Sequence, residues 1–489
     1  MVFNPFYDRT GADKLRNPFL IGVILIAAII TGFAIAKCGM TIAFGLMALP
    51  FVIYGFIMVV RVPERGFTFA IIINFLLIGL MRYIPVKLGY IMDITLVATY
   101  LAIFFHYFNK KLDITPVKND LVLLSVIWFI FIILELFNPE AISKMAWFSA
   151  MRGIGLYMLL IIPLVMFLYN EPKHLKRFLY IWAIFSIISS VKGFIQVNIT
   201  PDPWEQKWLD EVGGITHILW GQLRAFGIYS DAGQFGAAQA HIGIVATILM
   251  LNEKDIRRKI FWFIVMAAGY YGMSSSGTRG AVFVPMAGAV SYLILRLNIR
   301  VILIGSVIMI VVYAFFRYTT IGNSNYGIYR MRTAFTPEDD ASYQVRIRNQ
   351  IIFEEYLKNK PFGGGIGHAG DRAQQYTPNT FLANLATDSW FVLIWAESGV
   401  IGLYLHMFIL GYILGKSVHI IMFQIRNHEL YVLISALFAG FVGILGASYG
   451  NAVLGQFPTG LVVYASLAYI FMAPSLEKKI LDQNITRLW

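Results

Sequence analysis

The sequence predicts an all-α integral membrane protein, a polytopic bundle of transmembrane helices. Of its 489 residues, 58% are hydrophobic and 13% are charged, and the mean hydropathy is +0.68. A soluble domain carries about 25% charged residues, and no protein interior could hold such a surplus of apolar side chains. Apolar runs of about 20 residues, the length that crosses a bilayer, recur along the chain. We therefore expect one integral membrane domain over residues 1–489.

The apolar runs mark fourteen candidate spans, with twelve as the alternative count. The first run follows Lys14 and Arg16 and is longer than the core of a signal peptide, so we expect an uncleaved first span. The fourteen spans lie at about 19–37, 40–60, 66–82, 91–108, 119–137, 151–169, 175–197, 234–251, 259–276, 279–297, 299–317, 389–415, 429–449 and 453–473.

The distribution of lysine and arginine predicts the orientation of the bundle. Short cytoplasmic loops of membrane proteins retain these residues. With the N-terminus inside, most of the loop lysines and arginines fall on the inner side, including the cluster at 254–259. We therefore expect both termini in the cytoplasm. The formal net charge of +12 fits cytoplasmic loops on anionic lipid and gives no support for a nucleic-acid partner.

Two predicted outer segments, residues 199–233 and 318–387, are much longer than the other connections. Long connections are uncommon in compact proteins and are often functional or disordered. The first carries three tryptophans that we interpret as an aromatic belt at the membrane interface, with a sugar-stacking platform as the alternative. These tryptophans are Trp204, Trp208 and Trp220.

The second outer segment contains a predicted amphipathic helix at 343–358, which we expect on the outer membrane surface. Its apolar face would carry Ile347, Ile351, Ile352 and Tyr356. Pro361 ends this helix, and the glycines at 363–365 and 367 permit a tight turn. His368 follows in the same turn. A loop histidine is more often a surface residue than a ligand, but we include it among the candidate substrate-binding residues.

Arginines occur at three sites in the predicted outer segments. Arginine stays charged and presents a fixed fork of donors that suits phosphate and diphosphate oxygens. For any single arginine the alternative is an interfacial side chain that snorkels to water. Because all three arginine sites are predicted on the outer side of the membrane, a shared anionic ligand is favoured. The sites are Arg224 with Asp231 and Gln234, Arg279 in the turn 274–281, and Arg346 with Arg348.

Asp388 is an acid at the start of a predicted span. It could simply cap the helix N-terminus. It could also act as a general base that takes the proton of a sugar hydroxyl. Glu397 lies deeper in the same span and, because a carboxylate in lipid is costly, should face the bundle or a polar partner.

The sequence gives no indication of a metal or another cofactor. Cys38 is the single cysteine, and the eight histidines show no ligand spacing. Motifs for nucleotide phosphates, zinc proteases and serine hydrolases are also missing from the sequence.

Four ordered features resemble the O-antigen ligase and O-antigen polymerase superfamily of bacterial envelope glycosyltransferases, over about residues 220–405. They are Arg224-Ala-Phe-Gly with Asp231, Ser276-Gly-Thr-Arg279-Gly-Ala281, Arg346 leading to Pro361-Phe-Gly-Gly-Gly-Ile-Gly367, and Asp388-Ser389 followed nine residues later by Gly399-Val-Ile-Gly402.

The resemblance implies transfer of a glycan from an undecaprenyl diphosphate-linked donor to an acceptor hydroxyl at the outer, periplasmic face of the inner membrane. It implies neither a nucleotide sugar nor a metal. A ligase would use lipid A-core as the acceptor. A polymerase would use the next lipid-linked repeat, with a chain-length regulator protein as a candidate partner. The expected catalytic residues are Asp388, Arg279 and Arg224. The expected substrate-binding residues are Arg346, Arg348, Asp231, Gln234 and His368.

The chain departs from the ligase pattern at one position. That pattern has a histidine where Asp388 stands, whereas Ser389, Gly399 and Gly402 fit it. An aspartate at this position resembles polymerase-type relatives, so we favour a polymerase and keep a ligase as the alternative. A transporter is the alternative from another class, although carriers usually place polar groups near the bilayer midplane. A structural scaffold would explain the spans but not the polar insert.

Overall fold

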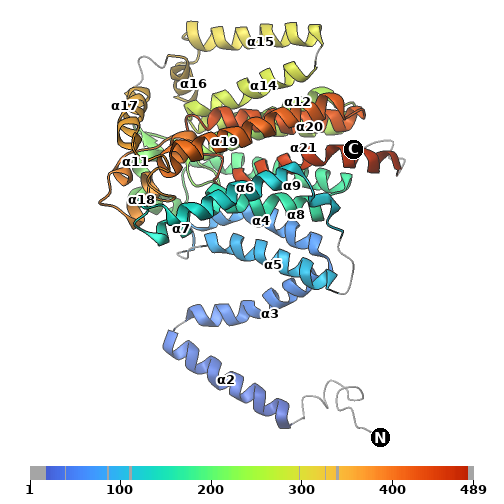
Figure 1. The fold of residues 1–489 in the computed structure, drawn as a ribbon, viewed down its shortest axis with the longest axis vertical. Helices are drawn as coiled ribbons and strands as arrows, with labels where there is room; N and C mark the ends of the chain where they lie inside the picture. Colours follow the sequence, from blue (N-terminus) through green and yellow to red (C-terminus); the bar gives the residue numbers. More distant parts are fainter. Residues whose placement is uncertain are drawn as a thin grey trace.

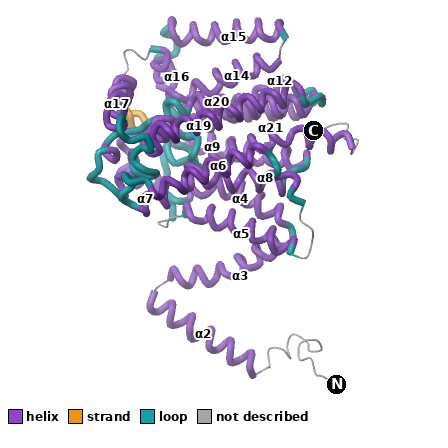
Figure 2. Tube along the Cα trace, viewed as in Figure 1, coloured by secondary structure: helices purple, strands orange, loops and turns teal. Residues whose placement is uncertain are grey.

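The computed structural model describes residues 18–38, 40–84, 88–108, 113–296, 298–324, 326–336 and 341–482. In these ranges the chain is almost entirely helical (Figure 2). Two short strands, β1 (Ile218–Leu219) and β2 (Gln222–Leu223), form the one antiparallel hairpin of this described part. The predicted all-α class is therefore confirmed.

Each of the fourteen predicted spans coincides with a helix or with consecutive helices in the described residues (Figure 1). By length and composition, ten helical stretches in this part could cross a membrane. The helices are α2 (Pro18–Cys38), α3 (Met40–Arg61), α4 (Pro63–Leu80), α5 (Gly89–Tyr107), α6 with η2 (Asp120–Phe137), α7 to α8 (Lys144–Leu168), α9 (Pro172–Asn198), α12 (Ala232–Asn252), α13 (Ile256–Ser275), α14 (Phe283–Arg296), α15 (Ile299–Tyr318), α19 (Trp390–Phe423), α20 (His428–Ala447) and α21 (Thr459–Asp482).

The centre of the bundle is formed by α12, α20 and α21, whose side chains are mostly buried. At one edge of Figure 1, α15 has no buried residue although its length is strongly apolar. A helix that is apolar on every side and uncovered by protein requires lipid around it. At the opposite edge, α2 and α3 extend away from the bundle. These exposed apolar helices indicate a multi-pass membrane protein.

The two long segments gather at one end of the bundle. In Figure 1 the short helices α11 (Gly214–His217), α17 (Ala341–Leu357) and α18 (Gly370–Tyr376) lie at the left, whereas α2 begins and α21 ends toward the right. The segments also touch. Arg330, on α16 (Tyr326–Arg332), donates from Nε to the Gly277 carbonyl at 3.3 Å, and its guanidinium lies 5.2 Å from the centre of the Trp220 ring. The membrane side that this end faces stays a prediction.

The first long segment is fastened by a buried arginine. The Arg82 guanidinium lies against the adjoining rings of Trp208 and Phe226, at 4.6 and 4.4 Å from their centres, and donates to the carbonyls of Tyr229 and Ser230. Burial lowers the pKa of Arg82 to about 10. Trp208 therefore packs inside the segment. Trp204 and Trp220 remain exposed, as an interfacial or sugar-binding role would require.

The helix α19 is broken at Gly399, which has φ 65° and ψ −168°. A break in a helix leaves nearby carbonyls without their usual N–H partners. Here the glycine-rich turn supplies them, because the amides of Gly364 and Gly365 donate to the carbonyls of Ala396 and Glu397 at 2.9 Å each. The turn therefore inserts into the break and ties the large segment to α19.

Only glycine allows this approach of two backbones. A Cβ added at Gly399 would lie 2.1 Å from the Pro361 carbonyl oxygen, and one added at Gly363 would lie 2.4 Å from the Gly399 nitrogen. Both glycines also have positive φ, a conformation that other residues rarely adopt. The glycines are thus explained by packing and not by phosphate binding.

The protein covers a different face of α17 from the one predicted to lie on the membrane surface. Phe353 and Leu357 are buried in a small cluster on α19, whereas Ile351 is 61% exposed. Tyr356, which was predicted on the membrane face, packs on protein, with its ring 4.6 Å from that of Phe381. The exposed isoleucines remain open to a membrane surface, and that placement stays a prediction.

Candidate functional site

An ion pair joins α17 to the start of α19. Arg346 Nε lies 3.4 Å from Asp388 Oδ2, and the two side chains are 34% and 44% exposed. Asp388 has φ 43°, in the left-handed region that is uncommon for residues other than glycine. The residues after it are fixed by the turn that follows α20, since Trp390 N and Ser389 Oγ donate to the Ser448 carbonyl at 2.9 and 3.3 Å. The carboxylate is therefore held at a defined place, accessible to solvent.

Four parts of the chain converge beside this ion pair. A Cβ added at Gly450 would lie 3.7 Å from Arg346 Nη1 and 4.0 Å from Gly280 Cα. A Cβ added at Gly280 or at Gly233 would lie 3.5 Å from Asn451 Nδ2. Four segments therefore meet around Gly450 and Asn451. They are α17, the short helix η5 (Arg279–Val282), the start of α12 and the turn at 447–451.

Gly450 and Asn451 were not predicted from the sequence. The only signal in the sequence was the short interruption at 450–452 between the last two predicted spans. Their importance appears only when the turn is seen between η5 and α17.

Arg279 is the first residue of η5 and is half-buried. Its neighbour Gly280 faces the same point as the Arg346 guanidinium. The structure thus brings the turn that carries Arg279, the Arg346 side chain and the Asp388 carboxylate into one region. The Arg346 guanidinium, the Asp388 carboxylate and the turn that carries Arg279 thus come from three separate segments and border a surface that glycines leave open.

Arg224 lies against the same turn, but protein groups occupy its donors. Nε donates to the Ser276 carbonyl at 2.9 Å, Nη1 to the Thr216 carbonyl at 3.0 Å and Nη2 to Thr278 Oγ1 at 2.8 Å. The side chain therefore connects the first long segment to the turn before η5. This geometry assigns Arg224 to holding the Arg279 turn in place.

We expect Arg224→Ala to destabilise this junction, because three hydrogen bonds from a charged group are lost, by roughly 2–4 kcal/mol. The measurement is limited proteolysis of residues 199–233 together with the thermal unfolding midpoint in detergent. Arg348→Ala is the control, since Arg348 is an exposed arginine of α17. An Arg224→Ala protein with unchanged protease resistance and no transfer activity would instead show that Arg224 contacts the substrate directly.

Asp231 and Gln234 shape the start of α12. Asp231 is the N-cap, with Oδ1 accepting from Gln234 N at 2.8 Å and Oδ2 accepting from Ser230 Oγ at 2.7 Å. The Gln234 side chain is buried, accepts from Ser230 Oγ at 2.7 Å and donates to the Phe457 carbonyl. Asp231 borders the surface near Asn451, while Gln234 lies beneath it.

Arg348 and His368 are not brought to the ion pair. Arg348 is exposed and lies two residues after Arg346, so the two side chains point to different sides of α17. His368 is buried, and its Nε2 accepts from Ser143 N at 2.9 Å while Nδ1 lies 3.0 Å from the Ile366 carbonyl. Burial lowers the pKa of His368, which fits a neutral ring with Nδ1 protonated. His368 therefore fastens the glycine-rich turn to the start of α7.

Glu397 is buried beside the break in α19. The amides of Gly367 and Ala369 and the Arg372 guanidinium lie near its carboxylate, whose Oε2 has no hydrogen-bond partner among the described residues. The expected polar partners therefore come from the large segment itself, and they add to the attachment of the glycine-rich turn.

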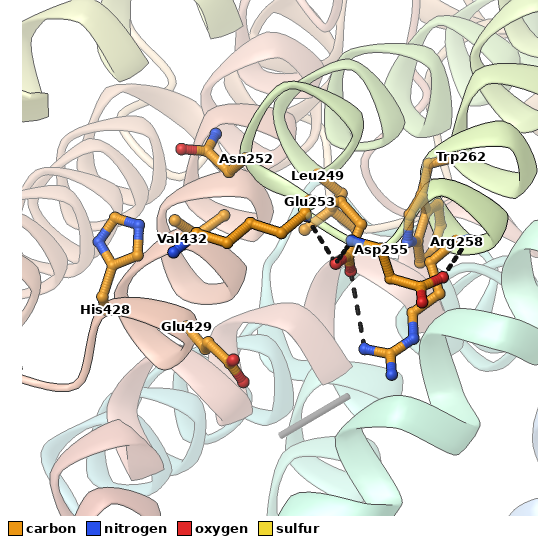
Figure 3. A pocket seen from close by; sticks show the side chains of 10 residues that line it. Leu249, Asn252, Glu253, Asp255, Arg258, Trp262, His428, Glu429 and Val432 are labelled. Atoms are coloured by element: carbon orange, nitrogen blue, oxygen red, sulfur yellow. Dashed lines mark hydrogen bonds and ion pairs between the residues drawn. The ribbon is translucent and has the colours of Figure 1, made fainter. Parts of the chain in front are cut away.

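A second polar pocket, of about 420 Å³, lies at the other ends of α12 and α20 (Figure 3). Its acids and bases face one another, as in the 3.9 Å approach of Arg258 Nη1 to Glu253 Oε2. Since α12 starts near Asn451 and ends at Asn252, this pocket is separated from the ion pair by the length of a helix of 21 residues. It contains none of the predicted site residues.

The fold and these contacts define a multi-pass helical membrane protein with a charged site at one end of its bundle. Residues 263–407 match the family described as O-antigen ligase. The matched region contains Arg279, Arg346, Asp388 and the glycine-rich turn. A search of curated proteins gave no match. The match confirms, over residues 263–407, the resemblance to the O-antigen ligase and O-antigen polymerase superfamily, a glycosyltransferase-type family.

Proposed function

We propose that this protein is a polymerase of a bacterial surface polysaccharide. It would transfer a glycan from an undecaprenyl diphosphate-linked donor to a hydroxyl of an acceptor sugar, at the periplasmic face of the inner membrane. The observation that carries the proposal is the position of Arg346, which pairs with Asp388 through Nε and faces the turn of Arg279 and Gly280 with Nη1. The guanidinium that would hold an anionic leaving group therefore lies next to the carboxylate that would take the proton of a hydroxyl.

The arginines act on the donor. As the bond between the anomeric carbon and the diphosphate oxygen breaks, its electron pair leaves with the diphosphate, whose negative charge grows. Arg279 and Arg346 stabilise that charge, and fixed donors around a developing anion give the largest share of many rate enhancements. The glycines at 280 and 450 leave room for oxygens to approach the backbone.

Asp388 acts on the acceptor. Its carboxylate takes the proton of the acceptor hydroxyl while that oxygen attacks the anomeric carbon from the face opposite the diphosphate. The anomeric configuration is inverted. Because Arg346 contacts Asp388 in the free protein, a bound diphosphate competes for the guanidinium and releases the carboxylate for this proton transfer. No metal is needed to balance the reaction.

The ligase remains the second candidate, because the matched family is described as O-antigen ligase. The aspartate at 388, where the ligase pattern has histidine, favours the polymerase. A transporter receives less support, since Arg346, Asp388 and the Arg279 turn lie at one end of the bundle, whereas carriers usually place polar groups near the midplane.

The test is deletion of the gene in the native host, followed by gel analysis of the surface glycan. We expect long ladders to disappear while a single repeat remains attached, as loss of a polymerase requires. Polymer stranded on the carrier lipid would indicate a ligase, and an unchanged glycan would contradict both assignments.

Complementation then tests the site. Wild-type and Arg348→Ala genes should restore the ladder. Arg279→Ala should not, because loss of one donor to a developing anion lowers transfer by roughly 100-fold or more. Expression is matched by immunoblot of membranes. Full restoration by Arg279→Ala would remove Arg279 from the proposed site.

A further inference from the structure

The pocket that contains the ion pair combines tyrosine rings, of which that of Tyr449 is exposed, with amide side chains. We call it the tyrosine pocket. Besides Arg346 and Asp388, its lining includes Tyr343, Asn349 and Gln350 from α17, Ser389 before α19, and Tyr449 from the turn after α20. These side chains come from three segments, and the proposed function assigns chemistry to Arg346 and Asp388 among them.

The side chain of Tyr449 is exposed, but hydrogen bonds fix the backbone at and beside this residue. The side chain is 60% exposed. Tyr449 N donates to the Gly446 carbonyl at 3.3 Å, and the carbonyl of Ser448 accepts from Trp390 N at 2.9 Å. An aromatic ring on a fixed backbone offers a large flat surface at a low cost in conformational entropy. Tyr449 is thus preorganised to receive a flat, partly apolar ligand.

The polar groups of the pocket complement that surface. Asn349 Nδ2 donates to the Ala386 carbonyl at 3.2 Å, which fixes the orientation of this amide and leaves its Oδ1 as an acceptor. Gln350 contributes a second amide. An apolar ring together with a few placed amides and a carboxylate suits a pyranose, which has an apolar C–H face and a rim of hydroxyls.

Arg346 lines the tyrosine pocket and joins it to the Arg279 turn. Its Nε faces Asp388, whereas Nη1 lies toward Gly450, whose added Cβ would also be 4.0 Å from Gly280 Cα. A diphosphate held by Arg346 on the side of Gly450 leaves the side of Asp388, Tyr449 and the amides for the sugar that carries the attacking hydroxyl.

We propose that the mouth of the tyrosine pocket is the acceptor subsite, where one pyranose ring lies with its apolar face on the exposed Tyr449 ring and its attacking hydroxyl at Asp388. The hollow beneath, of about 30 Å³, has room only for water. This inference rests on the proposed function and names the residues that select the acceptor. The competing explanation is that Tyr449 is one more aromatic residue of the membrane interface.

The test uses the full-length protein in lipid nanodiscs. The donor is the lipid-linked repeat extracted from the deletion strain, and the acceptor is the same repeat on a short water-soluble alkyl diphosphate. Tyr449→Ala should raise the acceptor KM about 10-fold, the size expected for loss of one aromatic contact. Its kcat and the binding of radiolabelled donor should stay close to wild type. Tyr449→Phe, which keeps the ring, should behave as wild type.

Tyr318→Ala is the matched control, because Tyr318 is also exposed and lies at the end of α15 that enters the large segment. It should leave the acceptor KM unchanged. Gln350→Ala is a second variant at the pocket and should also raise the acceptor KM, so the test stands if Tyr449→Ala does not fold. If the wild type is active and the folded pocket variants have an unchanged acceptor KM, the acceptor-subsite inference is wrong and the proposed function still stands. No transfer by the wild type, with either this acceptor or lipid A-core, overturns the proposed function.

Discussion

Replacing Asp388 by asparagine is expected to lower glycan transfer by roughly 100- to 10,000-fold, the usual contribution of a positioned general base. Asparagine has almost the shape of aspartate but is not a base, and it tolerates the left-handed backbone found at this position. The fold should therefore survive. The measurement is single-turnover transfer from the lipid-linked donor by the purified variant, with its thermal midpoint recorded beside it.

A matched comparison separates chemistry from charge. Asp388→Asn removes the anionic partner of Arg346, so donor binding should be retained or tightened as the guanidinium is released. Loss of donor binding together with transfer would mean that Asp388 acts by holding Arg346 in place. Transfer at the wild-type rate would remove Asp388 from the mechanism altogether.

Replacing Gly399 by alanine is expected to produce the largest loss of stability, roughly 3–5 kcal/mol. The added Cβ would lie 2.1 Å from the Pro361 carbonyl oxygen, so the glycine-rich turn must leave the break in α19. The positive φ at this position adds strain for any residue with a side chain. Thermal unfolding in detergent and protease sensitivity around residues 361–368 measure the effect.

The same helix provides the control for this prediction. Gly411 and Gly415 also lie in α19, and a Cβ at either position meets no atom within 4 Å. Alanine there should be neutral or slightly stabilising, because alanine favours helix over glycine by about 1 kcal/mol. Equal behaviour of Gly399→Ala and Gly411→Ala would show that the inserted turn does not hold the large segment.

Helix positions were predictable because lipid imposes a simple requirement. A spanning segment must be apolar over about 20 residues and must satisfy its own backbone hydrogen bonds. These local properties located every span from α4 to α21, although α19 and α21 end eight and nine residues beyond their predicted ends of 415 and 473. Which face of α17 packs on protein was not predictable, because its contacts with α19, and not the periodicity of Ile347 and Ile351, bury Phe353.

The candidate site was predicted by residue type and only partly by role. The chemistry of arginine indicated Arg224, Arg279 and Arg346 together as ligands of an anion. In the structure, however, the donors of Arg224 form hydrogen bonds with other groups of the protein. Hydrogen-bond partners that lie about 50 residues away cannot be read from a local motif. His368 and Gln234 are buried and hydrogen-bond to other segments of the chain, and their part in substrate binding stays a prediction.

The sequence by itself determined the membrane class, the positions of the helices and the ordered motifs of the family, because each depends on residues that are close together in the chain. The tertiary structure decided that Arg346 lies between Asp388 and the Arg279 turn, and it introduced Gly450, Asn451 and Tyr449. The physical reason is that a site at the end of a bundle is assembled from loops whose proximity follows from how the helices pack.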